Sequence, residues 1–323
     1  MKLLITGGAG YVGSHTVMYA QTLGHQVTVL DNFSTGHRTH IKNCEVIDLD
    51  LLDKSNLFKF LRGKSFDGVI HFAAKSLVEE SFIFPLDYYQ NNVIGSLNLI
   101  EAMKENSISN LVFSSSAAIF GKTNIEIINE DHPKNPINPY GKSKLIVEQM
   151  LRDISSEGNL SITSLRYFNA AGADPSGLIG ELHEPETHLI PKILQSLQNV
   201  SLPFSIYGSD YDTPDGTCIR DYIHVNDLAS VHLLALDRHY NIPGFFDYNI
   251  GSGRGYSVLE VMNTCSKITG KRVRYEFRKK REGDPQTLIA DNSKVTKELG
   301  WSPINSDLSN IVKTAWNWHR NLS

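Results

Sequence analysis

The stretch Thr6-Gly7-Gly8-Ala9-Gly10-Tyr11-Val12-Gly13 decides the fold of this 323-residue chain. It joins a short apolar strand, predicted over Lys2–Thr6, to a helix predicted over Tyr11–Leu23. Glycines let the backbone turn tightly and approach a pyrophosphate, and the helix N-terminus offers free N–H groups to phosphates. The glycines fit two spacings, Gly8-x-Gly10-x-x-Gly13 and Gly7-x-x-Gly10-x-x-Gly13. Because a strand precedes the turn and a helix follows it, the stretch predicts a dinucleotide-binding site.

A carboxylate follows the second predicted strand, Gln26–Leu30. Asp31 lies about 20 residues beyond the glycines, where an acidic side chain binds ribose hydroxyls and repels the extra phosphate of NADP. The order of strand, turn, helix and acid therefore predicts NAD as the cofactor. The alternative interpretation is a tight turn with a surface aspartate.

Strands and helices alternate through the first half of the chain. Further strands are predicted at Glu45–Asp48, Gly68–His71, Asn110–Ser114 and Ile162–Arg166, with long helices at Pro85–Glu105 and 139–156. Such repeats predict an α/β fold with a Rossmann-type doubly wound parallel sheet. After Asn169 the pattern changes. We expect an NAD-binding Rossmann domain over 1–170, to which 223–250 returns, and a smaller mixed α/β substrate domain over 171–323.

The composition excludes several classes of protein. The net charge is -4 and hydrophobic residues make up 41%, which does not indicate a nucleic-acid or membrane surface. The three cysteines, Cys44, Cys218 and Cys265, form no Cys-x-x-Cys pair, so we expect reduced, mostly buried thiols and a cytoplasmic location. A strand that begins at Lys2 leaves no room for a signal peptide. The twelve histidines show no His-x-x-x-His spacing on a helix, so no metal is predicted.

A tyrosine and a lysine lie four residues apart on the predicted helix that begins at Pro139, so Tyr140 and Lys144 share one face. The ammonium group stabilises a phenolate, and we expect it to lower the pKa of Tyr140. Such a tyrosine can take a proton from a sugar hydroxyl. Ser116 lies at the carboxyl end of a parallel strand, where ligands bind, although a serine-rich strand end alone more often begins a loop.

Ser116, Tyr140 and Lys144 together resemble the catalytic group of the extended short-chain dehydrogenase/reductases. Within that superfamily, Gly7–Asn32, Leu111–Gly121, Pro139–Gln149, Arg166–Gly172 and Asp212–Asp227 resemble the UDP-glucose 4-epimerases, and the resemblance covers nearly the whole chain. It implies a tightly bound NAD that takes a hydride from the sugar C4 and returns it to the other face of a transient 4-keto sugar. UDP-glucose and UDP-galactose would be interconverted, with Tyr140 as the base.

The resemblance also implies the remaining site residues. The residues it assigns to NAD binding are Gly7, Gly10, Tyr11, Val12, Gly13, Asp31, Asn32, Phe33, Ser34, Thr35, Gly36, Asp50, Leu51, Phe72, Ala73, Ala74, Ser76, Asn91, Ser114, Tyr140, Lys144 and Phe168. Those it assigns to the UDP-sugar are Ser116, Tyr140, Tyr167, Asn169, His188, Leu189, Tyr207, Arg220, Arg281, Asp284 and Leu288. For His188 a capping or packing role is an equal alternative. For Arg220 and Arg281 the alternative is a surface ion pair with Asp221 or Glu282.

At three places the sequence differs from members of the resembled families, and these differences bear on the substrate and on the type of reaction. Phe72-Ala73-Ala74-Lys75-Ser76 places Ser76 where well-known members carry a lysine, which leaves the role of Lys75 open. Leu288 stands where tyrosine restricts the substrate and a small residue admits N-acetyl sugars, so UDP-N-acetylglucosamine and UDP-xylose stay possible substrates. Sugar-nucleotide dehydratases need two acidic residues directly after the serine at this strand end. This sequence has Ala117 and Ala118 there, which favours an epimerase over a dehydratase.

The chain could instead be a non-enzymatic protein that senses NAD. Ser116, Tyr140 and Lys144 are all present, which argues against this alternative because such a protein need not keep a catalytic group. The resemblance further implies a homodimer formed through the helices at Pro85–Glu105 and 140–156.

Overall fold

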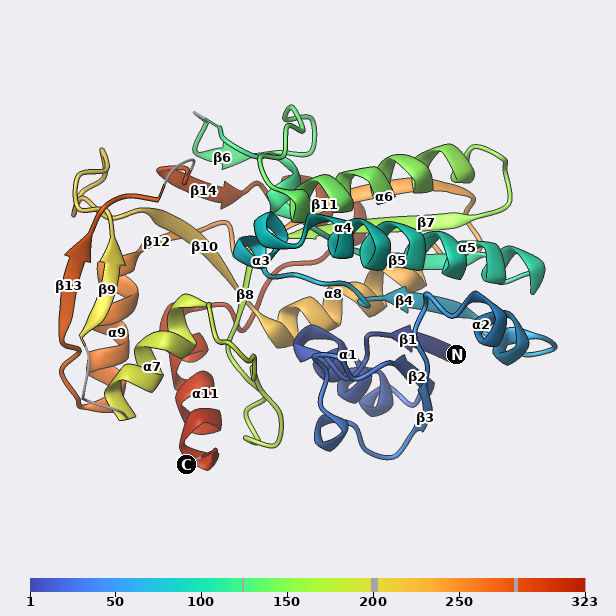
Figure 1. The fold of residues 1–323 in the computed structure, drawn as a ribbon, viewed down its shortest axis with the longest axis horizontal. Helices are drawn as coiled ribbons and strands as arrows, with labels where there is room; N and C mark the ends of the chain where they lie inside the picture. The colour runs from blue at the N-terminus through green and yellow to red at the C-terminus, as the bar shows by residue number, and fades with distance from the viewer. Residues whose placement is uncertain (124, 199–202, 282–283, 323) are drawn as a thin grey trace. The chain divides into compact units, whose positions relative to one another are not determined.

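The chain divides into two compact units, and the computed structural model describes residues 1–123, 125–198, 203–281 and 284–322 (Figure 1). The first unit comprises Met1–Gly121, Pro133–Arg166 and Ala229–Tyr248. The second comprises Lys122–His132, Tyr167–Leu228 and Asn249–Ser323. The expected division at residue 170 lies four residues beyond the observed one at Arg166. The sequence analysis did not expect Lys122–His132 to belong to the second unit.

A seven-stranded sheet forms the centre of the first unit, in the order β11-β7-β5-β4-β1-β2-β3. Its strands are β1 (Lys2–Thr6), β2 (Gln26–Asp31), β3 (Glu45–Asp48), β4 (Gly68–His71), β5 (Asn110–Ser116), β7 (Ser161–Tyr167) and β11 (Gly244–Ile250). β1 runs parallel to both β2 and β4, while β3 and β5 extend the parallel sheet on either side. The predicted α/β class and doubly wound sheet are confirmed. The strand order reverses between β1 and β4, which is where such sheets bind ligands.

Helices of the first unit pack an apolar layer against this sheet. They are α1 (Tyr11–Thr22), α2 (Lys54–Leu61), α3 (Val78–Ile83), α4 (Pro85–Tyr88), α5 (Gly95–Glu105), α6 (Pro139–Ser155) and most of α8 (Val225–Arg238), with short 3-10 turns at Arg38–His40 and Ala117–Ile119. One buried apolar cluster joins α2, α5 and α6 to β4 and β5, through Leu57, Leu99, Val147 and Leu151 among others. The sequence analysis missed α2 and α3, which are the shortest of these after α4.

The predicted single helix over Pro85–Glu105 contains a widened turn. Between α4 and α5 the backbone is π-helical over Tyr89–Ile94, a segment called η2 here. Such segments are rare and frequently mark functional sites. η2 places Asn91 and Asn92 beside α6, against which it packs.

Helix α6 begins as the sequence predicted. The Asn138 side chain accepts a hydrogen bond of 2.7 Å from Gly141 N, and Pro139 occupies the first helical turn. Tyr140, Lys144 and Glu148 follow at intervals of four residues and are all buried. One face of α6 therefore carries a column of buried polar groups.

The second unit contains a five-stranded sheet and a two-stranded one. The larger sheet runs β12-β10-β14-β6 with β8 also paired to β10, and comprises β6 (Ile127–Ile128), β8 (Asn169–Ala171), β10 (Ile219–His224), β12 (Gly255–Ser257) and β14 (Thr287–Ala290). The smaller pairs β9 (Phe204–Tyr207) with β13 (Tyr275–Arg278) in parallel. The sequence predicts a strand over Arg272–Phe277, which overlaps β13, and none of the others, because strands of two to six residues carry little periodicity.

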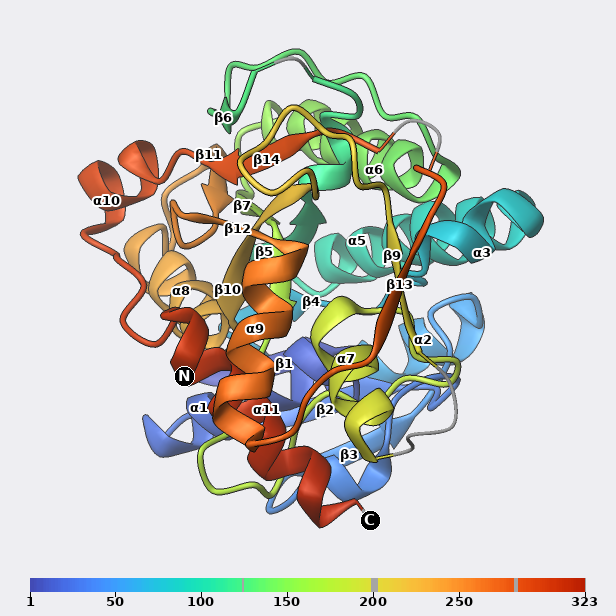
Figure 2. The same cartoon turned by 90° about the vertical axis from the view of Figure 1, so that its left-hand side faces the viewer.

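Three helices enclose the apolar core of the second unit, namely α7 (Leu189–Gln198), α9 (Val258–Thr269) and α11 (Leu308–Asn321), while α10 (Ser293–Leu299) is separate (Figure 2). Ile193, Val261, Cys265 and Ile311 belong to this core.

All three cysteines are free, with Cys218 and Cys265 buried and Cys44 half-buried, as predicted. Among the described residues, none of the helices is long and apolar enough to cross a membrane.

A buried arginine ties three elements of the first unit together. Arg166 on β7 is fully buried, and its Nη2 lies 2.7 Å from Glu148 Oε2 on α6 and 2.6 Å from Asp247 Oδ2 on β11. Arg152 contacts the same Asp247 at 3.2 Å, but its side chain is 56% exposed. The two arginines therefore share a partner and differ in burial.

We predict that Arg166→Met lowers the free energy of unfolding by about 3–5 kcal/mol, because it leaves the Glu148 carboxylate buried without its counter-charge. Arg152→Met, the matched control, should change it by less than about 1 kcal/mol, since an exposed ion pair contributes little. Urea unfolding of the purified variants measures both values. Equal losses in the two variants would contradict this account of Arg166.

Candidate active site

The glycine turn after β1 is tightly constrained by the backbone around it. Gly7 has a φ of 69°, and a Cβ there would lie 2.4 Å from Ala73 N at the end of β4. A Cβ on Gly13 would lie 2.2 Å from Gly7 O. No side chain fits at either position, so the close approach of β1, α1 and β4 requires glycine at Gly7 and Gly13.

The N-terminus of α1 is available to a phosphate group. Gly10 is its N-cap, and no side chain among the described residues caps the helix. Its first turn, which includes Tyr11 and Val12, contains no acidic residue. Free N–H groups and the positive end of the helix dipole are what a pyrophosphate needs, so this end of the helix fits NAD.

Asp31 lies beside the glycine turn at the end of β2. Its Oδ2 accepts a hydrogen bond of 2.9 Å from Ala9 N, and its Oδ1 accepts one of 2.8 Å from Phe33 N. Burial raises the pKa of Asp31, although these hydrogen bonds oppose the shift. Each carboxylate oxygen keeps a second lone pair that can accept a ribose hydroxyl. A Cβ on Gly36 would come within 3.0 Å of Oδ1, so glycine keeps the approach to Asp31 open.

The predicted adenine-side residues also come together. Asn32 Nδ2 donates to Asp50 Oδ2 at 2.8 Å, while Asn32 Oδ1 accepts from Ser34 N at 3.0 Å. The next residue, Leu51, is held through its carbonyl by Asn98 Nδ2 at 2.9 Å. The loop after β2, including Phe33 and the exposed Thr35, therefore lies against the segment that follows β3.

The end of β4 is bonded to the glycine turn. Phe72 N and Ala73 N both donate to Thr6 O, at 2.8 and 3.1 Å. Ala74 is half-buried and Ser76 is exposed. The open question about Lys75 has a structural answer, since its Nζ lies 3.7 Å from Asp87 and 4.0 Å from Glu80. Lys75 is therefore engaged in ion pairs on α3 and α4.

A buried asparagine that the sequence analysis missed links this strand end to α6. Asn92 Oδ1 accepts from Lys75 N at 2.8 Å and from the predicted Asn91 at 2.9 Å. Its Nδ2 donates to Ser143 Oγ at 3.0 Å, next to Lys144. The only signal in the sequence was its position directly after Asn91. The π-helical turn of η2 is what directs both asparagines towards the site.

Ser116, Tyr140 and Lys144 meet where β5 ends and α6 begins. Lys144 Nζ donates to Ser114 O at 2.8 Å and lies 6.0 Å from the centre of the Tyr140 ring. Ser116 hydrogen-bonds the Tyr140 side chain, and its Oγ also accepts from Ala118 N at 3.2 Å. The structure thus brings the predicted catalytic group together on two adjacent elements.

Burial dominates the electrostatics of this group. It raises the pKa of Tyr140, against the effect of the Ser116 hydrogen bond, and it lowers the pKa of Lys144 to about 7, although Glu148 opposes that shift. The expectation that Lys144 lowers the pKa of Tyr140 is therefore wrong for the chain without cofactor. Removing a phenolate from water outweighs a lysine that is itself poorly solvated.

Three of the residues predicted for the UDP-sugar meet on the larger sheet of the second unit. Arg220 Nη2 lies 2.6 Å from Asp284 Oδ1, and Leu288 is the register partner of Arg220 across β10 and β14. The alternative partner, Asp221, is buried and accepts instead from Ser252 and its neighbours. An ion pair between Arg220 and Asp221 is therefore the wrong interpretation.

The other predicted residues of the second unit are more dispersed. Arg281 stacks on Tyr207, with its guanidinium 4.3 Å from the ring centre, while its alternative partner Glu282 lies outside the described residues. Asn169 Nδ2 donates to Asp221 O at 2.7 Å. Before it, Phe168 is buried and Tyr167 half-buried at the end of β7.

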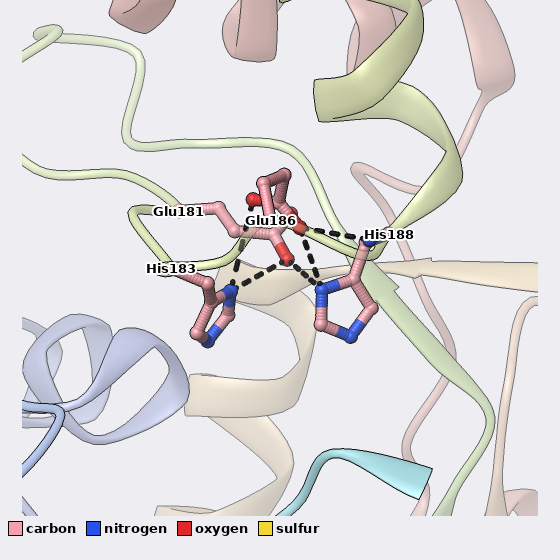
Figure 3. A group of neighbouring side chains, drawn as sticks. All are labelled: Glu181, His183, Glu186 and His188. Atoms are coloured by element: carbon pink, nitrogen blue, oxygen red, sulfur yellow. Dashed lines mark hydrogen bonds and ion pairs between the residues drawn. The ribbon is translucent and has the colours of Figure 1, made fainter. Parts of the chain in front are cut away.

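His188 immediately precedes α7 and belongs to a group with Glu181, His183 and Glu186 (Figure 3). Burial opposes charge on both histidines, but the two carboxylates outweigh it and raise the pKa of His183 to about 9 and that of His188 to about 10. The packing alternative for His188 is therefore supported by its ion pairs. The sequence analysis missed the group because it looked for ligands on a helix, and these residues lie on a loop.

Comparison with known proteins agrees with this geometry. Residues 3–251 match the NAD dependent epimerase/dehydratase family. A UDP-glucose 4-epimerase of Halalkalibacterium halodurans is 45% identical over 320 residues, covering 99% of this chain and 96% of that protein. The structure of a UDP-glucose 4-epimerase from Brucella ovis in complex with NAD is 42% identical, with a TM-score of 0.94 over 98% of this chain and 97% of that one.

A UDP-glucose 4-epimerase structure from Stenotrophomonas maltophila, with bound NAD and formylated UDP-arabinopyranose, is 37% identical with a TM-score of 0.96, over 100% of this chain and 98% of that one. The chain belongs to the NAD dependent epimerase/dehydratase family and, within it, to the UDP-glucose 4-epimerases.

From the pKa of Lys144 we predict how the free energy of unfolding, in the chain without NAD, differs between wild type and Lys144→Met as the pH changes. Its folded pKa of about 7 lies below the ordinary 10.5, so the unfolded chain binds more protons between these values and stability rises with pH there. Lys144→Met should therefore raise the free energy of unfolding by at most about 5 kcal/mol near neutral pH, and this gain should disappear as the pH approaches that of a free lysine.

Chemical denaturation across this pH range tests the difference between variant and wild type. Lys142→Met is the matched control, because Lys142 is exposed on the same helix and its removal should produce no such trend. A difference for Lys144→Met that stays constant with pH would show that Lys144 does not titrate in this window.

Proposed function

We propose that this chain interconverts UDP-glucose and UDP-galactose through a transient 4-keto sugar, with Tyr140 as the base. The observation that carries the proposal is the group of half-buried Ser116 with buried Tyr140 and Lys144, which lies at the same edge of the sheet as the glycine turn and Asp31. Family membership supports NAD as the cofactor. When bound, NAD accepts a hydride from the sugar C4 and later returns it.

The chain's own residues move and hold the proton. Tyr140 Oη takes the proton of the sugar 4-OH as the carbonyl forms, and gives it back when the alcohol re-forms. Ser116 donates a hydrogen bond that stabilises the phenolate. Lys144, held by Ser114 O, supplies positive charge 6.0 Å from the centre of the ring. Burial excludes water, which strengthens each of these interactions.

The residues after Ser116 favour epimerisation over elimination. Ala117 and Ala118 begin the 3-10 turn that Ser116 caps, and neither side chain can transfer a proton. A 4-keto intermediate at this strand end has no assisted route to loss of water. The proton and hydride are therefore returned, and no net oxidation results.

We propose that the second unit holds the UDP moiety and the sugar. Arg220 and Arg281 suit a diphosphate, because guanidinium groups bind pairs of oxygens. The ion pair of Arg220 with Asp284 gives the arginine a fixed orientation before substrate arrives. Asn169, His188, Leu189 and Tyr207 complete the proposed contacts. Leu288, beside Arg220, is intermediate in size, so N-acetylated and pentose sugars are the substrates to compare with UDP-glucose.

Tyr140→Phe should lower turnover of UDP-glucose to UDP-galactose by at least about 10³-fold, because it removes the only hydroxyl that accepts the 4-OH proton. The purified wild type should carry NAD and need no added reduced cofactor. Tyr88→Phe is the control, since Tyr88 packs edge-on against Tyr140 with ring centres 6.5 Å apart but donates its hydroxyl to Leu77 O and Glu80.

A coupled assay of UDP-galactose formation, with NAD content measured in each variant, separates chemistry from folding. If Tyr140→Phe keeps NAD and turns over within tenfold of wild type, Tyr140 is not the base. If wild type carries NAD but converts only UDP-N-acetylglucosamine or UDP-xylose, the substrate assignment changes while the role of Tyr140 stands.

We also propose that the chain forms a homodimer in the cytoplasm. Large apolar side chains are exposed on and around α3 and α4, namely Phe82, Ile83, Phe84 and Leu86, with Ile146 on the adjacent α6. Leu86 is 73% exposed. Apolar exposure of this extent on packed helices marks an interaction surface. The free thiols agree with a reducing compartment.

Ile83→Glu should shift sedimentation from dimer to monomer, because it places a charge within the proposed interface. Ile304→Glu is the control, since Ile304 is 85% exposed and belongs to the second unit, whereas α3 and α4 belong to the first. A wild type that sediments as a monomer, or a dimer that Ile83→Glu leaves intact, would contradict this interface.

A further inference from the structure

Two histidines and two glutamates converge on the loop that precedes α7, and neither the proposed catalysis nor the NAD site uses them as a group. They are Glu181, His183, Glu186 and His188, shown together in Figure 3. Each offers one ligand atom, and these four atoms all lie within 4.8 Å of one another. The arrangement combines two imidazole nitrogens with two carboxylates, which is a ligand set that Zn²⁺ and similar ions accept.

The distances within the group are close to those of a tetrahedral metal site. Metal–ligand bonds of about 2.0–2.2 Å separate the ligand atoms by about 3.3–3.5 Å. His183 Nδ1 lies 3.2 Å from Glu181 Oε1 and 3.8 Å from Glu186 Oε2. His188 Nδ1 lies 2.8 Å from Glu181 Oε1 and 3.1 Å from Glu186 Oε1. These four separations lie within about 0.6 Å of the tetrahedral values, and the four ligand atoms all lie within 4.8 Å of one another.

A buried carboxylate oxygen points to a missing partner. The Glu181 side chain is 5% exposed, and within the described residues its Oε1 accepts no hydrogen bond of normal geometry. The oxygen nevertheless faces the Nδ1 atoms of both histidines. These ion pairs hold the oxygen without an aligned hydrogen bond, and a cation bound between these atoms would coordinate it.

Outer contacts orient the ligands. Thr187 N and His188 N donate to Glu186 Oε1 at 2.7 and 2.8 Å. Trp318 on α11 donates from Nε1 to the Glu181 carbonyl at 2.8 Å. Hydrogen bonds of this kind hold metal ligands in place and are part of built metal sites.

We propose that Glu181, His183, Glu186 and His188 bind one divalent transition-metal ion of the Zn²⁺ class. Four protein ligands leave no open position, so the site is structural. It closes the loop before α7 and fixes the backbone that leads into Leu189. His188 would bind through Nδ1, which leaves its Nε2 available for another hydrogen bond.

The competing description is a closed ion-pair group with two protonated imidazoles and no metal. Metal binding must then displace those protons, and affinity should rise with pH. The two descriptions differ in whether the folded chain takes up a metal ion at all, which can be measured without reference to activity.

The test uses the full chain without a histidine tag, stripped with a chelator and titrated with Zn²⁺ at mildly alkaline pH. Calorimetry should show about one ion bound per chain, and Zn²⁺ should raise Tm. Co²⁺ in place of Zn²⁺ should give the intense visible absorption of a tetrahedral site. His183→Gln should weaken binding by at least about 100-fold, since one of four ligands is lost.

His132→Gln is the matched control, because His132 lies in the same unit outside the group and should bind as wild type does. Retained NAD in His183→Gln shows that the variant folds, and Glu181→Gln provides a second loss of ligand. A wild type that takes up no Zn²⁺ would overturn the proposal, as would Zn²⁺ bound equally by wild type and His183→Gln.

Discussion

A row of alternating buried charges holds the catalytic helix in place. Lys144 on α6 is bonded to the end of β5 through Ser114 O, and Glu148, one turn further on, opposes the drop in the pKa of Lys144. Glu148 is in turn bound by the fully buried Arg166, which also binds Asp247. Neighbouring charges in the row have opposite signs, and removal of Arg166 leaves the Glu148 carboxylate buried without its counter-charge. The position of Tyr140 depends on this row because it lies on the same face of the same helix.

The same burial sets the chemical state of the tyrosine. In the chain alone, desolvation raises the pKa of Tyr140, so the phenol is protonated at neutral pH. A base is formed only if a further positive charge arrives near the ring. We propose that the glycine turn, the N-terminus of α1 and Asp31 hold NAD, whose nicotinamide ring would bring such a charge. Cofactor binding and activation of the base are therefore one event in this account.

Much of the first unit was predictable from sequence because its signals are local. The glycine turn, Asp31, the Asn138 cap and the spacing of Tyr140 and Lys144 are each contained within a few residues. Asn92 and the role of Lys75 were not predictable, since Asn92 lies in the π-helical turn of η2 and Lys75 forms ion pairs with α3 and α4. The direction of the Tyr140 pKa was wrong for a similar reason: spacing shows which groups are near, but burial decides which charge is favoured. In the second unit, strands of two to six residues and a ligand-like group on a loop left almost no periodic pattern to detect.

The most direct test of the account is a spectroscopic pH titration of the Tyr140 phenolate, taken as the absorbance difference between wild type and Tyr140→Phe, with and without bound NAD. The account predicts a pKa above about 10, the ordinary value for tyrosine, in the chain without NAD. With NAD bound, the pKa should fall by several units towards neutrality. A pKa that is already near neutral without NAD, or one that stays above its ordinary value when NAD is bound, would contradict the claim that the cofactor's charge creates the base.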